Sequence, residues 1–229
     1  MNLEVASPIL SFNIGSFVVN ITRDIIVQWV IILMLFIIAC LLTRNLKRVP
    51  SKRQVVLESL YKYVEGLVTN NIGESYTEFI PYVGTIVVYL ICLNFSGLVG
   101  VEPATSNLSV TFGLALTSFL VINITALRKN GAIGYLKAYG QPYVLMLPIN
   151  IMERVVLPVS LALRLYGNMF AGSLLIGLIY KALCKIAVFA SIGLPIVAHA
   201  YFDIFDGAIQ MLVFTMLTII NMKMTVEHH

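Results

Sequence analysis

Long apolar runs dominate this sequence and restrict the folds that are open to it. The chain has 229 residues, of which 59% are hydrophobic and only 11% are charged. A run of about 20 apolar residues is what a helix needs to cross the bilayer core, and a chain built from such runs is a polytopic membrane protein. No polar stretch is long enough for a separate soluble domain, so we expect a single all-α membrane domain over residues 1–229.

Several other classes are disfavoured by the same sequence. The N-terminus has an acidic Glu4 and no basic segment, unlike a signal peptide. The three cysteines lie far apart without CxxC or Cys/His spacing, so neither a metal site nor a disulfide framework is expected, and we predict no cofactor. The net charge of +4 bears on membrane topology and does not indicate nucleic-acid binding.

The first half of the chain predicts three crossings. Residues 1–24 form an external leader and 25–43 the first span, because the five bases between Arg44 and Arg53 place that end in the cytoplasm. Residues 54–72 predict an amphipathic helix on the cytoplasmic side, with a soluble-type helix on a loop as the alternative. Residues 79–101 and 109–127 form the next two spans, and a basic, glycine-containing cytoplasmic loop follows over 128–141.

Two later segments, 143–180 and 186–223, are longer than a span needs. Each has about 38 residues, or about 57 Å as one helix, so it must be strongly tilted or broken. A pair of short spans is less favoured because neither segment has a polar turn at its midpoint; Pro158 and Pro195 are lone kink candidates. Lys181 and Lys185 mark the external turn between the two helices. The count is five crossings, with the N-terminus outside and the C-terminus in the cytoplasm.

Arg164 lies in the middle of the apolar stretch 158–178. Roughly ten apolar residues or more on either side keep its side chain from reaching an interface. An arginine at that depth is costly and stays charged, so a functional role is favoured over the alternative of a headgroup anchor.

Polar side chains form a stripe on each long helix. Ser160, Arg164 and Asn168 share one face at i, i+4 and i+8, Glu153 falls near it, and Ser173 lies on the opposite side. On the last helix the stripe contains His199, Asp203, Asp206 and Gln210, with Asn221 further along. Acids and a histidine in an apolar helix supply what an ion path requires. The alternative is hydrogen bonding between helices, for which a carboxylate is a poor choice.

Three stretches of this sequence match a known family. They are LPVSLALRLYGNMFAGSLL around Arg164, VEPATSNLSVTFGLAL between two predicted spans, and FDGAIQMLVFTMLTIINMKM near the C-terminus. The chain resembles subunit a of F-type ATP synthases, in which an arginine lies in a PxSLxLRLxGN setting. The resemblance covers essentially the whole chain, and the arginine motif is long and specific.

The resemblance implies a non-catalytic stator subunit of a rotary ATP synthase. In that family the two long tilted helices lie against a ring of c subunits, and two half-channels for H⁺ or Na⁺ open to opposite sides. The arginine separates the half-channels and attracts the ring carboxylate. The implied partners are the c-subunit ring, the peripheral-stalk b subunits, the remaining synthase subunits through these, and the lipid bilayer. The implied location is the inner membrane of a bacterial cell.

The family roles transfer to individual positions of this sequence. Arg164, Asn168 and Gln210 match the arginine, asparagine and glutamine of the family, and Asp203 lies where members carry a histidine or glutamate. Ser173 falls where some members carry a glutamate or histidine. The family commonly has an acidic residue fourteen positions before the arginine. This sequence has Asn150 at that position, and Glu153, about one turn away, is the candidate replacement. His199, Asp206 and Ser160 are further half-channel candidates.

Two other functional classes remain as alternatives. A stand-alone ion channel or secondary transporter is less favoured because no internal repeat is visible. An intramembrane protease is less favoured because Asp203 and Asp206 share one helix and lack a protease motif.

Overall fold

The fold is known from a computed structural model that describes residues 10–14, 17–44, 47–99, 103–139, 145, 147–186 and 197–227. The α-helices of these residues are α1 (Arg23–Thr43), α2 (Lys52–Ile72), α3 (Ile80–Asn94), α4 (Leu108–Tyr139), α5 (Leu147–Ile186) and α7 (Gly207–Glu227). Three 3₁₀ turns flank α3, at Glu74–Phe79, Phe95–Val99 and Ala104–Ser106, and a π-helix over Ala200–Asp206 leads directly into α7. The predicted helical fold class is confirmed.

A short β-hairpin precedes α1, where the sequence predicted only a leader. Strand β1 (Leu10–Ile14) pairs with β2 (Phe17–Ile21) in antiparallel register, with Leu10 opposite Ile21. The alternation of apolar and polar residues in these few positions is too short to separate a strand from a polar leader by sequence pattern.

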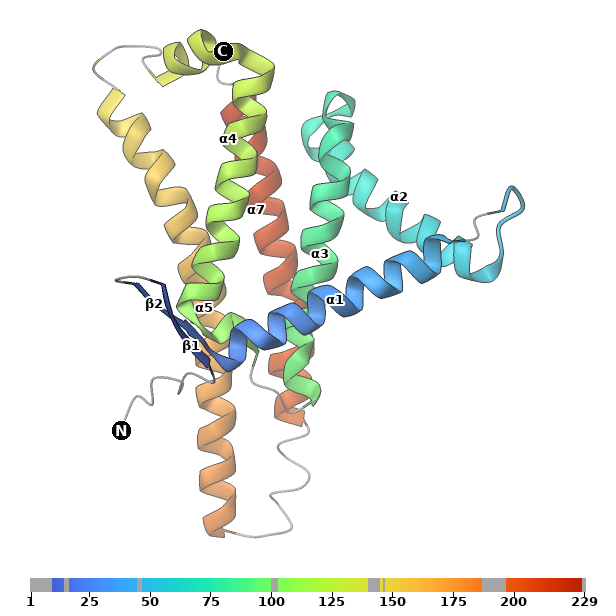
Figure 1. Ribbon diagram of the computed structural model, residues 1–229, viewed down its shortest axis with the longest axis vertical. Helices are drawn as coiled ribbons and strands as arrows, with labels where there is room; N and C mark the ends of the chain where they lie inside the picture. The colour runs from blue at the N-terminus through green and yellow to red at the C-terminus, as the bar shows by residue number, and fades with distance from the viewer. Residues whose placement is uncertain are drawn as a thin grey trace.

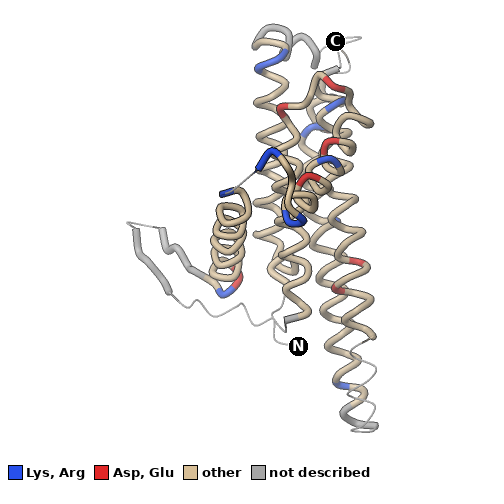
Figure 2. Tube along the Cα trace, turned by 90° about the vertical axis from the view of Figure 1, so that its right-hand side faces the viewer, with Lys and Arg blue, Asp and Glu red and all other residues tan. Residues whose placement is uncertain are grey.

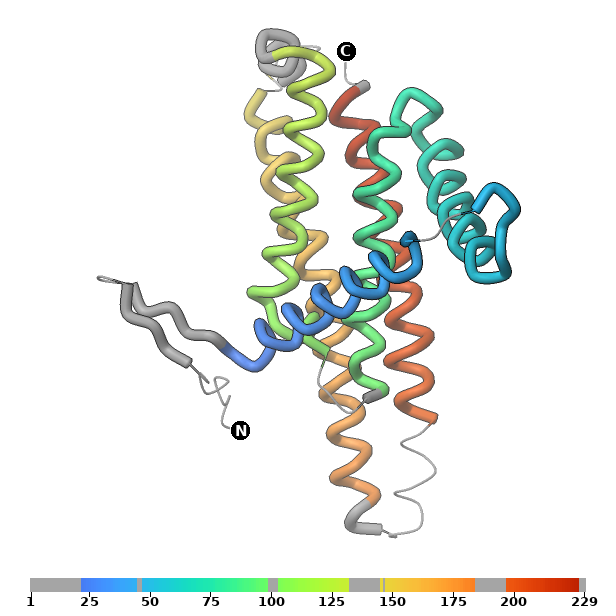
Figure 3. Tube along the Cα trace, turned by 45° about the vertical axis from the view of Figure 1, so that its right-hand side comes forward, coloured from blue at the N-terminus to red at the C-terminus, as the bar shows by residue number. Residues whose placement is uncertain are grey.

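Four helices form an upright bundle (Figures 1 and 3). Helices α3, α4, α5 and α7 run along the long axis, α1 crosses them obliquely, and α2 departs sideways from the end of α3. Helix α7 is the central element, since it packs against α2, α3, α4 and α5. The innermost side chains come from α2, α3, α4, α5 and α7: Val68, Leu90, Ala115, Leu165, Phe214, Ile219 and Met222.

Five helical stretches in the described part of the chain are long and apolar enough to cross a membrane. They cover residues 23–43, 74–98, 108–131, 147–183 and 197–226. Much of their apolar surface faces outward, and in the first stretch only 6% of the most apolar window is buried. A bilayer solvates such a surface, whereas water would not.

The largest differences from the predicted boundaries are at the ends of two helices. Helix α4 continues to Tyr139, through the segment predicted as a loop, and changes direction at Gly131, whose φ of 70° is readily adopted only by glycine. Helix α5 continues to Ile186, so Lys181 and Lys185 lie in the helix and not in a turn. This end of α5 projects beyond its neighbours (Figure 1).

The two candidate kinks also have separate outcomes. Pro158 lies inside α5 and is buried, and the helix passes through it without interruption. Pro195 lies outside the described residues.

Helix α2 is covered over only part of its predicted apolar face. Val64, Val68 and Ile72 are buried, whereas Val56 and Leu60 are 68% and 46% exposed. The helix ends at Gly73, whose φ is 88° and whose N–H donates to the Thr69 carbonyl at 3.0 Å.

Candidate functional site

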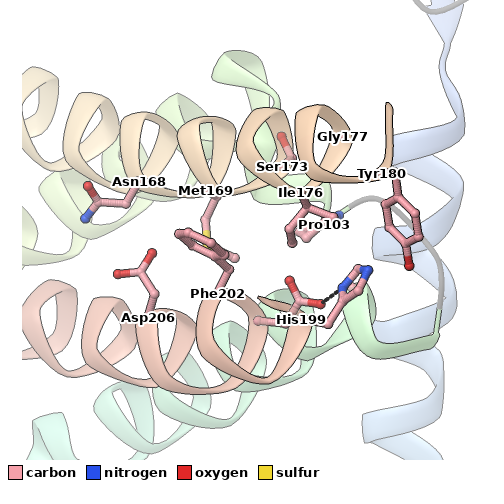
Figure 4. A pocket seen from close by; sticks show the side chains of 13 residues that line it. Pro103, Asn168, Met169, Ser173, Ile176, Gly177, Tyr180, His199, Phe202 and Asp206 are labelled. Atoms are coloured by element: carbon pink, nitrogen blue, oxygen red, sulfur yellow. Dashed lines mark hydrogen bonds and ion pairs between the residues drawn. The ribbon is translucent and has the colours of Figure 1, made fainter. Parts of the chain in front are cut away.

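A cavity of about 350 Å³ lies between α5 and the π-helix, near the end of α3 (Figure 4). Its polar lining includes Asn168 of the first predicted stripe and three members of the second, together with Ser173, predicted on the opposite side, and Tyr180, which was not predicted as a site residue. The polar side chains are Asn168, Ser173, Tyr180, His199, Asp203 and Asp206. The structure therefore brings together six side chains from segments that are up to 38 positions apart, in one space within an otherwise apolar bundle.

His199 and Asp203, one turn apart, form a hydrogen-bonded pair at one end of the cavity. His199 Nδ1 lies 2.6 Å from Asp203 Oδ2, and Asp203 is only 5% exposed. A buried carboxylate requires a partner, and the imidazole supplies it. The Tyr180 ring lies beside the histidine, with ring centroids 6.0 Å apart.

Asp206 lies at the opposite end of the cavity, on the side of Asn168 (Figure 4). It is half-buried, and the Phe202 ring lies between it and His199. Ser173 also lines the cavity, and its hydroxyl donates to the Phe170 carbonyl at 2.9 Å. The helical projection placed Ser173 opposite Arg164; in the structure it shares the cavity with Asn168.

Asn168 and Gln210 form an amide pair at the end of the cavity where Asp206 lies (Figure 4). The Nδ2 group of Asn168 donates to Gln210 Oε1 at 2.6 Å, which links α5 to α7. Gln210 is 2% exposed, and its Nε2 group has no hydrogen-bond partner within the described part of the chain. A buried donor without a partner costs about 1–3 kcal/mol, so this N–H group favours an acceptor such as a water oxygen beside it.

Arg164 lies one turn before Asn168 on the outer face of α5. Arg164 is exposed, and so are Ser160 and Glu153. Leu161 and Leu165 of the same helix are buried. Among the residues that the structure describes, none forms a hydrogen bond or ion pair with the Arg164 side chain. The face of α5 that carries this charge is open for a partner.

Arg154 was not identified as a candidate from the sequence. Its guanidinium donates to the Thr225 hydroxyl, which in turn donates to the Asn221 carbonyl at 2.7 Å. Arg154 therefore joins α5 to α7, whereas Glu153, its neighbour, is exposed. An arginine in a long apolar run is a signal that the sequence did contain.

Asn94, Gly97 and Thr105 also lie next to the cavity without having been predicted as site residues. Asn94 is 0% exposed and donates through Nδ2 to the Gly207 carbonyl at 2.9 Å. Gly97 is one of the residues that line the cavity. Small and amide side chains are common in membrane helices, so their types alone did not distinguish them.

Chemically, the cavity is a chain of titratable groups that ends at an amide pair. It runs from Tyr180 and His199 through Asp203 and Asp206 to Asn168, and the uncovered arginine follows one turn further on. Carboxylates and an imidazole exchange protons, and the carboxylate oxygens can also ligate a cation.

Comparison with known proteins identifies the family. The family described as ATP synthase A chain matches residues 25–223. The sodium ion specific ATP synthase subunit a of Propionigenium modestum is 30% identical over 237 residues, which cover 96% of this chain and 77% of that protein. ATP synthase subunit a 2 of Bradyrhizobium sp. (strain BTAi1) is 34% identical over 216 residues, covering 93% and 92%. ATP synthase subunit a of Moorella thermoacetica is 31% identical over 223 residues, covering 97% and 98%.

The family match covers nearly all of the five apolar helical stretches of the described chain and every residue that lines the polar cavity. The chain therefore belongs to the ATP synthase subunit a family, whose members are multi-pass membrane subunits of rotary ATP synthases.

Proposed function

We propose that this chain forms two ion half-channels against a ring of c subunits and couples ion flow across the membrane to rotation of that ring. The observation that carries the proposal is the uncovered Arg164, one turn from the end of a polar cavity. In this proposal, ATP chemistry is carried out by other subunits of the complex and not by this chain.

The electrostatics of Arg164 favour a carboxylate partner. An unpaired guanidinium within the bilayer costs at least about 2.5–3.5 kcal/mol, and arginine does not lose its charge. A deprotonated ring carboxylate passing α5 offsets this cost. The same positive charge repels any cation that would move directly from one half-channel to the other.

The outer half-channel corresponds to the cavity. Most Lys and Arg residues lie in the half of the molecule that contains the C-terminus (Figure 2), and basic residues favour the cytoplasmic side. The C-terminus is then cytoplasmic and the N-terminus external. His199 and Tyr180 lie toward the end remote from the C-terminus, so ions reach Asp203 and Asp206 from outside.

The cytoplasmic half-channel follows the exposed stripe of α5. Glu153 and Ser160 precede Arg164 on this face, in the part of the helix nearer the C-terminus of the chain. Glu153 is the titratable group of the stripe, about one turn from Asn150, where the family commonly has an acid.

Glu153→Gln is expected to slow ATP-driven ion pumping several-fold, because it removes the group that exchanges ions with the cytoplasm. Pumping is measured over a pH series in inverted membrane vesicles. Glu78→Gln, which alters an exposed carboxylate on another element, is the control and should pump normally. Normal pumping by Glu153→Gln at every pH would remove Glu153 from the path.

The proposed partners follow from the exposed surfaces. The c-subunit ring covers the stripe of α5, the b subunits of the peripheral stalk and the lipid bilayer cover the remaining apolar faces, and the bacterial inner membrane is the location. The carboxylates of the cavity can exchange H⁺ or ligate Na⁺, so pumping is measured with both ions. A stand-alone channel is the alternative, but the open face of α5 requires a partner.

Cross-linking tests the proposed contact with the ring. Ser160→Cys, with the three native cysteines replaced by serine, should form a disulfide with a cysteine placed beside the ring carboxylate. Val155→Cys is the control: it is 60% exposed but lies about 140° away around α5. Equal cross-linking by both variants, or none by Ser160→Cys, would contradict the proposed contact.

A further inference from the structure

The end of α3 makes a close contact with the π-helix that carries both acids of the cavity. Asn94 Nδ2 donates to the carbonyl of Gly207, the residue directly after the π-helix, at 2.9 Å. The Thr105 hydroxyl donates to Asn94 Oδ1 at 3.1 Å, and Asn94 and Thr105 are both 0% exposed. Both polar atoms of the amide are therefore engaged in holding this junction.

Gly207 allows this approach because it has no side chain. A Cβ at this position would lie 3.0 Å from Asn94 Cβ, which is tighter than ordinary packing. π-Helical turns are rare and need support from their surroundings, and the buried Asn94 supplies a polar contact at the point where the π-helix becomes α7.

Gly97, one turn beyond Asn94, makes room for the Asp203 carboxylate. A Cβ on Gly97 would lie 2.7 Å from Asp203 Cγ and 2.8 Å from each carboxylate oxygen. Among the described residues, positive φ occurs only at Gly73 and Gly131, so the Gly97 backbone does not itself require glycine. The space that the glycine leaves open is occupied by the carboxylate.

We propose that Gly97 and Asn94 are positioning residues for Asp203: Gly97 leaves the space that the carboxylate fills, and Asn94 holds the helical junction that directs it there. The proposal rests on the outer half-channel proposed above. Asp203 is thereby kept buried and within 2.6 Å of His199, with Asp206 at the far end of the same π-helix. Gly97 and Asn94 therefore determine where the Asp203 carboxylate lies when an ion reaches it.

The decisive experiment is a double-mutant cycle between positions 97 and 203 in the intact complex. Gly97→Ala should lower ATP-driven pumping by about tenfold and alter its pH profile, because the added methyl displaces the carboxylate from His199. Gly84→Ala, in helix α3 just before the 3₁₀ turn that contains Gly97, is the matched control. Its added Cβ would lie 3.7 Å and 4.0 Å from the Val64 methyl carbons, an ordinary contact, so it should pump normally.

The cycle is completed by Asp203→Ala, which removes all three atoms that the new methyl would meet. In that background Gly97→Ala should not further lower the thermal stability of the complex, whereas with Asp203 present it should. Equal losses of stability in both backgrounds would show that glycine is needed for another reason and would overturn the positioning role. Normal pumping by Asp203→Ala, with the stability coupling intact, would instead contradict the proposed half-channel alone.

Asn94 is tested by variants that differ in one hydrogen bond. Asn94→Asp keeps the oxygen that accepts from Thr105 but loses the donor to Gly207, and it should shift the pH profile of pumping as Gly97→Ala does. Thr105→Ser keeps the hydroxyl and should leave the profile unchanged. An unchanged profile for Asn94→Asp would show that the junction does not position the acid.

Discussion

Replacing Arg164 by alanine is expected to abolish ATP-driven ion pumping and to raise passive ion leak through the assembled complex. Without the guanidinium, a ring carboxylate has no opposite charge at the point between the half-channels, and no positive charge repels ions that cross directly. Moving one charge across the membrane is worth about 2.3 kcal/mol per 100 mV, so even a partial leak dissipates the drive. Both effects are measured in inverted vesicles, with the complex shown to be present by subunit composition.

Two variants sharpen the Arg164 experiment. Arg164→Lys keeps the charge but replaces the planar guanidinium with a compact ammonium, and it should retain little pumping while leaking less than Arg164→Ala. Arg128→Ala removes an exposed arginine elsewhere and is the control for charge loss in general. Near-normal pumping by Arg164→Ala would mean that Arg164 is an anchor, and the stator mechanism would have to be abandoned.

Asp203→Asn is expected to lower ATP synthesis at least about tenfold, the second largest effect. The amide has the shape of the carboxylate and still fits the space at Gly97, so the change isolates the titratable group from its packing. An amide does not exchange a proton, and it cannot replace the carboxylate that contacts His199. Ion uptake from the outer half-channel should therefore become rate-limiting.

The measurement is ATP synthesis driven by an imposed ion gradient, repeated across a pH series. Asp24→Asn serves as the comparison, because Asp24 accepts a hydrogen bond from Asn107 at 2.7 Å but lies outside the cavity. Synthesis that is unchanged at every pH would exclude Asp203 from the ion path.

The membrane helices were predictable because their signal is local. An apolar run of sufficient length crosses the bilayer whatever its neighbours are, and α1 is the clearest example. The polar stripes were also predictable, since His199 and Asp203, spaced i and i+4, do face each other in the structure. Arg164 was identified by the cost of its charge and not by any contact.

Other features depend on tertiary contacts that no local pattern reports. The π-helix ends at a contact between Gly207 and Asn94, 113 positions earlier in the chain. A projection at 100° per residue assumes a regular α-helix, so it could not predict the π-helix. The different directions of Glu153 and Arg154 follow from the packing of α5 on α7. The role of Gly97 depends on where the Asp203 carboxylate lies, which sequence spacing does not give.

The hydrogen bonds and the buried residue that attach helix α1 to the rest of the described structure all lie in its N-terminal half. Asp24 and Gln28 make its side-chain hydrogen bonds to other helices and turns, with Asn107 and Tyr89, and Ile31 is its one buried residue. Beyond Ile31 it borders an apolar groove of about 610 Å³ between α1, α2 and α3.

This attachment has a consequence for biogenesis. Because α1 satisfies its own backbone and hides almost no surface in the bundle, it is stable in the bilayer before its neighbours are made, as two-stage insertion requires. Its inclination in the finished bundle then depends on the contacts of Asp24 and Gln28, which form only when Asn107 and Tyr89 are in place.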